Sequence, residues 1–423
     1  MAVITIFSGT FCKEEQVCRE VQSRTGYVFF HDGDLVSEAS RLSGIPEGRL
    51  ERAFSARTSV FNKFTHEKER SVAYLRLAVA GLLAKDGLLI SGFAGLLIPS
   101  EVSHVLRTCL IADMKFRISL AMVEQGLSEK EASKVIRKQD EDRTVWVHTL
   151  LQKADPWDAS LYDIVMPTDK TGVAEAAALI VRSAASDILK PTAASKKAVE
   201  DLLLASRVDI ALLEEGHHVA VAVKEGHVTL TINKHVLMLS RLEEELKGIA
   251  GKVDGVNSVE TKVGKGFYQT DVYRKFDFEL PSKVLLVDDE REFVQTLSER
   301  LLMRDMGSAV AYDGESALNM IAEDEPEVMI LDLKMPGIDG IEVLRRVKES
   351  RSEIEVIILT GHGSEVDRET CMKLGAFAYL QKPVDIEVLS ETLKRANEKV
   401  QKAKEHKRKK MPPLDIKNCR ENR

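Results

Sequence analysis

The C-terminal part of the chain alternates short apolar runs with longer segments of helical period. Four runs rich in β-branched and aromatic residues are each followed by a polar loop and an amphipathic segment: Val284–Val287, Val328–Leu331, Val356–Leu359 and Phe377–Leu380. Such alternation predicts a parallel sheet with helices on both faces.

Polar residues follow each of these runs. Asp288, Asp289 and Glu290 follow the first run, Asp332 the second, Thr360 the third and Lys382 the fourth. Ligands of open parallel sheets bind at the carboxyl ends of the strands, and carboxylates that converge there can bind a hard cation such as Mg²⁺. We predict that Asp332 is a nucleophile for a phosphoryl group and that Lys382 and Thr360 stabilise the charged oxygens.

The motifs V-L-L-V-D-D-E, L-D-L-K-M-P-G-I-D-G, I-L-T-G-H-G and Y-L-Q-K-P closely resemble the receiver domain of two-component response regulators, over residues 283–400. The resemblance implies a flavodoxin-like (βα)5 domain in which Asp332 accepts phosphate from a phosphohistidine of a sensor histidine kinase or a phosphotransfer protein. It also implies the remaining roles: Asp288 and Asp289 with Asp332 and the Lys334 backbone carbonyl as Mg²⁺ ligands, and Thr360 and Tyr379 as the switch.

The N-terminal part, residues 1–190, also shows α/β alternation. Its expected strands are Val3–Ile6, Leu88–Ser91, Cys109–Ala112 and Asp163–Val165, and a capping box, Ser128 to Glu131, marks a helix start. The segments L-I-A-D-M-K-F-R-I, E-Q-G-L-S-E-K-E-A-S-K-V-I-R-K-Q-D-E-D-R and W-D-A-S-L-Y-D-I-V-M-P-T-D resemble the cytidylate-kinase-like family of P-loop kinases. The resemblance places Arg117, Arg137 and Arg143 on the side of a phosphate-clamping lid and Asp32 near an acceptor nucleotide.

The phosphate loop of this domain departs from the family pattern. A P-loop needs glycines, a lysine and a Ser or Thr around the phosphates. Here F-S-G-T-F-C-K-E-E-Q-V offers Gly9 and Lys13, but Glu14 and Glu15 stand where a hydroxyl should bind Mg²⁺. Carboxylates at a helix N-terminus satisfy the helix dipole that would hold phosphate. We therefore predict a degenerate loop, and Lys13, Arg117, Arg137 and Arg143 could serve either nucleotide binding or a charged surface.

A shorter unit, residues 194–264, has a predicted α-β-β-α-β order. A helix at Ser195–Ser206, a hairpin of His218–Val223 with His227–Ile232, a helix at Leu239–Ala250 and a strand at Val256–Val263 are expected. The frame V-x-V-K-E-G-H-V-T-L resembles the BON domain, a module of membrane or partner attachment.

Four histidines of this unit invite comparison with a metal site: His217, His218, His227 and His235. Because neighbouring residues of a strand point to opposite faces, we predict solvent-facing histidines and no metal site.

Two further segments complete the domain organisation. Residues 265–282 are expected to be a linker, and residues 401–423 a basic, disordered tail that lacks aromatic residues to stack on bases. We predict no DNA-binding output domain.

Composition supports a folded protein of several domains. The chain has 423 residues, is 44% hydrophobic and carries a net charge of −7, so no global positive field draws it to nucleic acid or anionic lipid. Five scattered cysteines without a C-x-x-C pair, an N-terminus without an export signal and the lack of a long apolar stretch predict a cytoplasmic protein without a membrane span.

The overall prediction is an α/β multidomain response regulator whose receiver signals to its own N-terminal modules or to a partner, with a receiver-mediated homodimer as one arrangement. The alternative is a nucleoside monophosphate kinase, of cytidylate-kinase type, that the receiver controls; this alternative requires ATP near Lys13. The sequence leaves open whether the chain is an enzyme.

Overall fold

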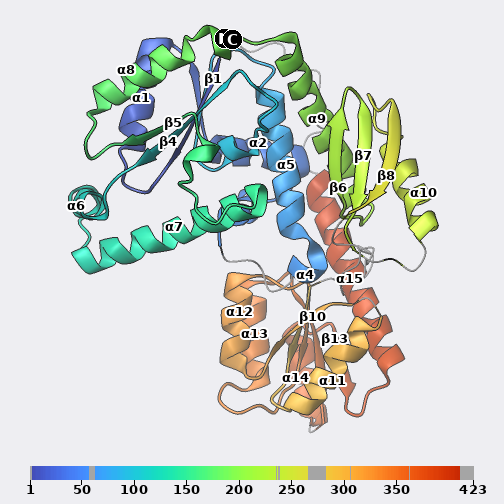
Figure 1. Ribbon diagram of the computed structural model, residues 1–423. Helices are drawn as coiled ribbons and strands as arrows, with labels where there is room; N and C mark the ends of the chain where they lie inside the picture. Colours follow the sequence, from blue (N-terminus) through green and yellow to red (C-terminus); the bar gives the residue numbers. More distant parts are fainter. Residues whose placement is uncertain are drawn as a thin grey trace. The chain divides into compact units, whose positions relative to one another are not determined.

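The computed structural model describes residues 2–56, 62–234, 236, 239–264, 283–304, 306–361 and 363–409, with backbone alone at 63, 64 and 404–409 (Figure 1). The chain divides into two compact units, Met1–Thr58 with Lys68–Arg274 and Ser59–Glu67 with Lys275–Arg423. The predicted linker, residues 265–282, lies outside the described residues.

The N-terminal domain is built on a five-stranded parallel sheet of order β2-β3-β1-β4-β5. Its strands are β1 (Val3–Ser8), β2 (Val28–His31), β3 (Leu88–Ser91), β4 (Val105–Ile111) and β5 (Ile164–Pro167). The central strand β1 is buried along its whole length, and Ile4 pairs with Leu89 on one side and Leu106 on the other. Its apolar side chains therefore serve the cores on both faces.

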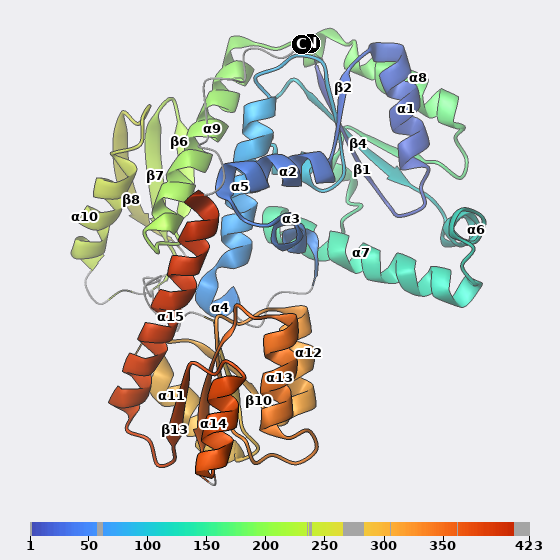
Figure 2. The same cartoon turned by 180° about the vertical axis from the view of Figure 1, so that it is seen from behind.

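Helices cover both faces of this sheet. Helices α1 and α8 pack side by side on one face, where Val17, Val21 and Ile180 join the core, and both views show this pair (Figure 1 and Figure 2). The other face carries α2 and α5 together with Trp146 of α7. The helices of this part are α1 (Glu14–Thr25), α2 (Asp32–Ser43), α3 (Glu47–Glu51), α5 (Glu67–Leu82), α6 (Met114–Gln125), α7 (Glu129–Leu151) and α8 (Val173–Ala184), whereas α4 (Asn62–Thr65) falls within the second compact unit.

The middle unit has the predicted α-β-β-α-β order. Strands β6 (Ala220–Lys224) and β7 (His227–Ile232) are antiparallel, and β8 (Ser258–Val263) pairs with β7 in parallel. Helices α9 (Ala193–Glu214) and α10 (Leu239–Ala250) cover one face of this sheet through Val208, Leu212 and Leu246. The α9 helix is longer than predicted, because its apolar spacing continues past Ser206 to Leu212.

The C-terminal domain has a second parallel sheet, of order β10-β9-β11-β12-β13. Its strands are β9 (Val284–Val287), β10 (Ser308–Ala311), β11 (Val328–Leu331), β12 (Glu355–Thr360) and β13 (Ala378–Gln381). Helices α11 and α15 cover one face, and α12, α13 and α14 the other. Their bounds are α11 (Arg291–Leu302), α12 (Gly314–Glu323), α13 (Gly340–Ser350), α14 (Glu365–Lys373) and α15 (Ile386–Lys409).

The fold confirms the predicted multidomain α/β class, and two strands are additions to the prediction. Strand β2 contains the apolar run Val28–Phe30, which was not used in the sequence prediction, and β10 is the short segment S-A-V-A, with one β-branched residue. Helix α15 continues to Lys409, so the expectation of disorder from residue 401 onward is wrong for residues 401–409. None of the helices in the described residues is long and apolar enough to cross a membrane.

Candidate functional site

The carboxyl ends of β9 and β11 bring three carboxylates together in the C-terminal domain. Asp288 and Asp289 directly follow β9, Asp332 directly follows β11, and these two strands are neighbours in the sheet. A ligand oxygen of each carboxylate lies within 4.8 Å of the other two. Asp288 and Asp332 are buried and Asp289 is exposed, so the cluster opens to solvent on one side.

Lys382 closes the buried side of this cluster. It follows β13, and its Nζ lies 2.6 Å from Asp288 Oδ2 and 3.3 Å from Asp332 Oδ2. The same Nζ lies 4.4 Å above the centre of the Phe293 ring. Burial alone would lower the pKa of Lys382, but hydrogen bonds to Asp288 and Glu290 outweigh it and raise that pKa. Lys382 is therefore a fixed cation beside Asp332.

The Asp332 carboxylate is oriented by its own loop. Its Oδ1 accepts hydrogen bonds from the backbone N–H of Leu333, at 2.7 Å, and of Lys334, at 3.4 Å, while Oδ2 faces Lys382. Gly340 makes this loop possible, because a Cβ there would lie 2.2 Å from the Asp332 carbonyl oxygen. The glycine of the L-D-L-K-M-P-G-I-D-G motif thus lets helix α13 begin directly against the carboxylate loop.

The donor set fits a hard divalent cation. Burial raises the pKa of Asp288, and its hydrogen bonds to Lys382 and to the Glu290 N–H work in the opposite direction. Three carboxylates with one lysine leave a net negative site, and oxygen ligands with room for water are what Mg²⁺ requires. Asp288, Asp289 and Asp332 are the residues that could hold it.

The predicted switch residues lie on adjacent strands. Thr360 ends β12 and is fully buried, and its strand neighbour β13 carries Tyr379. The Tyr379 hydroxyl is buried without a hydrogen-bond partner among the described residues, and burial raises its pKa. A Cβ on Gly363 would overlap this hydroxyl and lie 3.0 Å from Thr360 Cγ2, so glycine leaves the space that the tyrosine fills.

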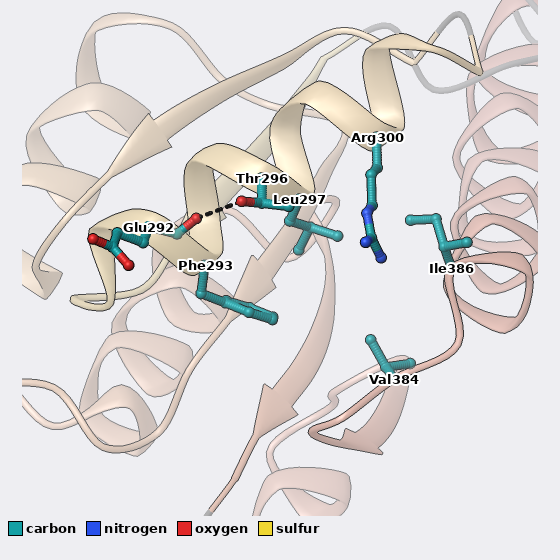
Figure 3. A pocket seen from close by; sticks show the side chains of 7 residues that line it. All are labelled: Glu292, Phe293, Thr296, Leu297, Arg300, Val384 and Ile386. Atoms are coloured by element: carbon teal, nitrogen blue, oxygen red, sulfur yellow. Dashed lines mark hydrogen bonds between the residues drawn. The ribbon is translucent and has the colours of Figure 1, made fainter.

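Sequence reasoning missed two features near this site. The Glu290 carboxylate accepts a hydrogen bond from Lys382 Nζ at 2.9 Å. Its position directly after Asp289 was the feature of the sequence that could have indicated this contact. A shallow groove of about 350 Å³ lies between helix α11 and the loop that follows Lys382 (Figure 3). Its lining residues are Glu292, Phe293, Thr296, Leu297, Arg300, Val384 and Ile386.

The corresponding loop of the N-terminal domain is occupied by the chain's own side chains. Arg117 of α6 is buried, donates to the Thr10 carbonyl at 2.7 Å, and forms two hydrogen bonds with Asp140, at 2.7 and 2.9 Å. A Cβ on Gly9 would lie 3.3 Å from the Arg117 guanidinium carbon. Buried Cys12 fills the middle of the loop, and burial raises the pKa of its thiol to about 11.

The start of helix α1 is occupied in the same way. The Arg143 Nε donates to the Ser8 carbonyl at 2.6 Å, and the Ser8 hydroxyl donates to Glu14 in the first turn of α1. Lys13 lies in the left-handed region, with φ 57°, and its Nζ lies 4.9 Å above the ring of Phe116. Arg117 and Arg143 thus meet at the loop, whereas Lys13 contacts an aromatic ring.

Asp32 holds a turn at the carboxyl end of the same sheet. Its two carboxylate oxygens accept the backbone N–H groups of Phe93, at 2.8 Å, and Ala94, at 2.9 Å. Gly92 has a φ of +107°, and a Cβ there would collide with this carboxylate at 2.1 Å. Burial raises the pKa of Asp32 to about 7, against the hydrogen bonds from Phe93 and Ala94.

The structure does not bring Arg137 or the histidines into a site. Arg137 is exposed on α7, and it forms no hydrogen bond or ion pair with another residue in the described part of the chain. His217 is fully buried, which corrects the expectation that it faces solvent; its Nε2 lies 3.4 Å from Glu245 Oε1. His227 is exposed and bonds Ser258, and His235 lies outside the described residues. Within the described ranges, the carboxylates that converge closely enough to hold a metal ion are those of Asp288, Asp289 and Asp332.

Comparison with known protein families agrees with both ends of the chain. Residues 284–394 match the response regulator receiver domain, and residues 3–170 match the cytidylate kinase-like family. The resemblance of residues 194–264 to the BON domain stays a prediction.

Curated relatives match the C-terminal domain. The response regulator MprA of Mycolicibacterium vanbaalenii is 34% identical over 110 residues, which are 26% of this chain and 48% of that protein. The transcriptional regulatory protein CpxR of Escherichia coli K12 is 42% identical over 102 residues, 24% of this chain and 43% of that protein. The match thus spans about half the length of these relatives.

A solved structure matches the same region. A response regulator receiver domain protein from Clostridium thermocellum is 33% identical and covers 29% of this chain and 98% of its own, with a TM-score of 0.28. By the family matches, one chain contains two recognised domains. The strand ends that meet around Asp332 lie in a response regulator receiver domain, residues 284–394. The loop that Arg117 and Arg143 contact lies in a domain of the cytidylate kinase-like family, residues 3–170.

Proposed function

We propose that the chain is a two-component response regulator whose receiver domain accepts a phosphoryl group on Asp332 from a phosphohistidine of a sensor histidine kinase or a phosphotransfer protein. The observation that carries the proposal is the position of Lys382, which bonds both Asp288 and Asp332 beside a cluster of three carboxylates. A nucleophilic carboxylate, a metal-binding acidic pair and a fixed cation are the parts that phosphoryl transfer requires.

The acidic cluster is proposed to hold Mg²⁺ through Asp288, Asp289 and Asp332, with the Lys334 backbone carbonyl as a further ligand. When bound, the cation supplies positive charge to the oxygens of the incoming phosphoryl group. In the transfer, an Asp332 carboxylate oxygen forms the new P–O bond while the P–N bond to imidazole breaks and the imidazole nitrogen keeps the electron pair. The N–H donors of Leu333 and Lys334 hold Asp332 Oδ1, and Oδ2, which accepts a longer hydrogen bond from Lys382, is the proposed attacking atom.

Lys382 and Thr360 are proposed to stabilise the charge of the phosphorylated site. Lys382 lies beside Asp332 Oδ2 in the structure, and Thr360 ends the next strand of the sheet. Because the Tyr379 hydroxyl is buried beside Gly363 and Thr360 without a partner among the described residues, a shift of Thr360 toward phosphate changes the space that this ring occupies. Thr360 and Tyr379 are therefore the proposed two-state element.

The output is proposed to run through the N-terminal modules of the chain or through a docking partner. The cytidylate kinase-like domain is proposed to act without phosphorylating nucleotides. Its lid-side arginines, Arg117 and Arg143, are bonded to the carbonyls of Thr10 and Ser8, and Glu14 occupies the first turn of α1. This observation weighs against the alternative function, a receiver-regulated nucleoside monophosphate kinase.

Labelling by acetyl phosphate tests the proposal. The full chain with Mg²⁺ should become phosphorylated, measured as a mass increase and as a retarded band on a phosphate-affinity gel. Asp332→Asn should abolish this labelling, because the nucleophilic oxygen pair is lost. Asp339→Asn, which removes an exposed carboxylate from the same loop, is the matched control and should label at the wild-type level. Undiminished labelling of Asp332→Asn would contradict the proposed function.

A further inference from the structure

Glu290 has an unusual role at the start of helix α11. It occupies the N-cap position, yet its side chain accepts no hydrogen bond from the backbone N–H groups in the first turn of α11, all of which the structure describes. Its backbone N–H donates to Asp288 Oδ1 at 2.9 Å. N-cap side chains commonly satisfy the free N–H groups of their own helix, so the Glu290 carboxylate serves another partner.

That partner is Lys382. The ammonium group has three N–H donors, and it has three carboxylate acceptors: Asp288 at 2.6 Å, Glu290 at 2.9 Å and Asp332 at 3.3 Å. The side chains of Asp288 and Asp332 are 6% exposed, whereas that of Glu290 is 64% exposed. Every donor of Lys382 is therefore engaged before any phosphoryl group arrives.

We propose, on the basis of the proposed function, that Glu290 is a positioning residue that restrains Lys382 and limits the rate at which Asp332 takes up a phosphoryl group. For Lys382 to bind a phosphoryl oxygen, one of its three hydrogen bonds must break. The bond to Glu290 breaks at the least cost, because water can solvate the exposed carboxylate that is released, whereas Asp288 and Asp332 are buried and would lose their ion-pair partner with little water to replace it.

Glu290 also adds negative charge on the exposed side of the site. A phosphoryl donor that approaches the open side of the cluster carries negative charge itself, so the Glu290 carboxylate repels it. Neutralising Glu290 should therefore release Lys382 and weaken the repulsion together. Both effects favour transfer to Asp332.

The test is Glu290→Gln in the full chain, with two readouts. At saturating Mg²⁺ the initial rate of labelling by acetyl phosphate should rise roughly threefold to tenfold. In the absence of donor, calorimetric titration should show Mg²⁺ bound roughly threefold more weakly, since one negative charge beside the acidic cluster is lost. Faster transfer with weaker cation binding is a combination that a merely damaged site would not give.

Glu292→Gln is the matched control, because it removes the same charge two residues after Glu290. The Glu292 side chain lines the groove of Figure 3 and forms no ion pair with Lys382 among the described residues. It should change both readouts by less than about twofold. A labelling rate for Glu290→Gln equal to or below that of the wild type, or an equal rise in Glu292→Gln, would overturn the inference while leaving the proposed function intact. A wild-type chain that takes no label would overturn both.

Discussion

The two parallel sheets of this chain treat their carboxyl ends in opposite ways. In the receiver domain, Asp288, Asp289 and Asp332 converge with a single lysine and leave an acidic site that opens to solvent. In the cytidylate kinase-like domain, Arg117 and Arg143 bond the backbone carbonyls of the loop. The carboxyl end of the receiver sheet thus keeps charged groups available for a ligand. At the carboxyl end of the other sheet, the charged side chains bond the domain's own backbone.

The difference shows that an architecture specifies where chemistry can occur but not whether it does. A phosphate loop binds anions because its N–H groups are free and point inward. In this chain the loop carbonyls of Ser8 and Thr10 point to arginines, and a buried cysteine occupies the centre. The loop joins a strand to a helix as a nucleotide-binding loop does, but its polar groups bond side chains of the same domain.

The largest expected effect is a loss of stability when the hydrogen bonds that Arg117 makes to the loop are removed. Arg117→Met keeps most of the side-chain volume but removes the hydrogen bonds to Asp140 and Thr10, so a partly buried carboxylate and a carbonyl lose their partner. We expect the free energy of unfolding of this domain to fall by about 3 kcal/mol. The two tryptophans of the chain, Trp146 and Trp157, both lie in this domain, so their fluorescence during urea denaturation reports its unfolding separately from the receiver.

Arg137→Met is the control for this experiment, since Arg137 is exposed and its guanidinium forms no hydrogen bond or ion pair with a described residue. It should change the unfolding free energy by less than about 0.5 kcal/mol. Equal destabilisation by the two substitutions would show that Arg117 does not hold the loop and that the contrast between the two domains is mistaken.

The same contrast explains what the sequence could predict. In the receiver, each proposed functional residue follows an apolar run directly or after one residue, so the strand pattern by itself predicts that Asp288, Asp332, Thr360 and Lys382 lie at one edge of the sheet. Glu290 was missed as a partner of Lys382, because the two residues are 92 positions apart and their contact depends on side-chain geometry that the strand pattern does not contain.

In the N-terminal domain the sequence predicted a degenerate loop but not its occupants. Arg117 and Arg143 were expected on the lid side, and nothing in their spacing indicated that they bond the carbonyls of Thr10 and Ser8. Helix content was also easier to predict than strands: the capping box at Ser128 is confirmed, whereas β4 begins at Val105, where Arg107 and Thr108 interrupt the apolar pattern. Tertiary contacts compensate for such interruptions, and a local pattern does not contain them.

A smaller effect is expected on the pH dependence of the unfolding free energy, through Asp32 of the N-terminal domain. Burial raises the pKa of Asp32 to about 7 in the folded domain, above the ordinary value of 3.8, so the folded state binds more protons than the unfolded state between these limits. This contribution to stability is complete below about pH 4 and is lost as the pH rises through about 7. Asp32→Asn should remove it, so the change in unfolding free energy between pH 4.5 and pH 8 should differ from the wild-type change by about 1 kcal/mol, after allowance for solvent screening.

Tryptophan fluorescence at the two pH values measures this difference, and Asp34→Asn is the matched control for the loss of one carboxylate from helix α2. A pH dependence of Asp32→Asn that equals the wild-type dependence would show that the turn at Phe93 and Ala94 is held by an ordinary surface carboxylate.

The smallest expected effect is the absence of a nucleotide signal. When ATP or CMP is titrated into the full chain at constant Mg²⁺, so that cation binding by the receiver contributes no heat, we expect no binding up to roughly 1 mM. Glu14→Ser restores a hydroxyl at the start of α1 but leaves Arg117 and Arg143 on the loop carbonyls, and it should bind no better if the arginines close the site. Binding by Glu14→Ser alone would assign the closure to the glutamate. Binding by the wild type together with ADP production would instead make the N-terminal domain a working kinase under receiver control, and the two strand edges would then differ in substrate rather than in openness.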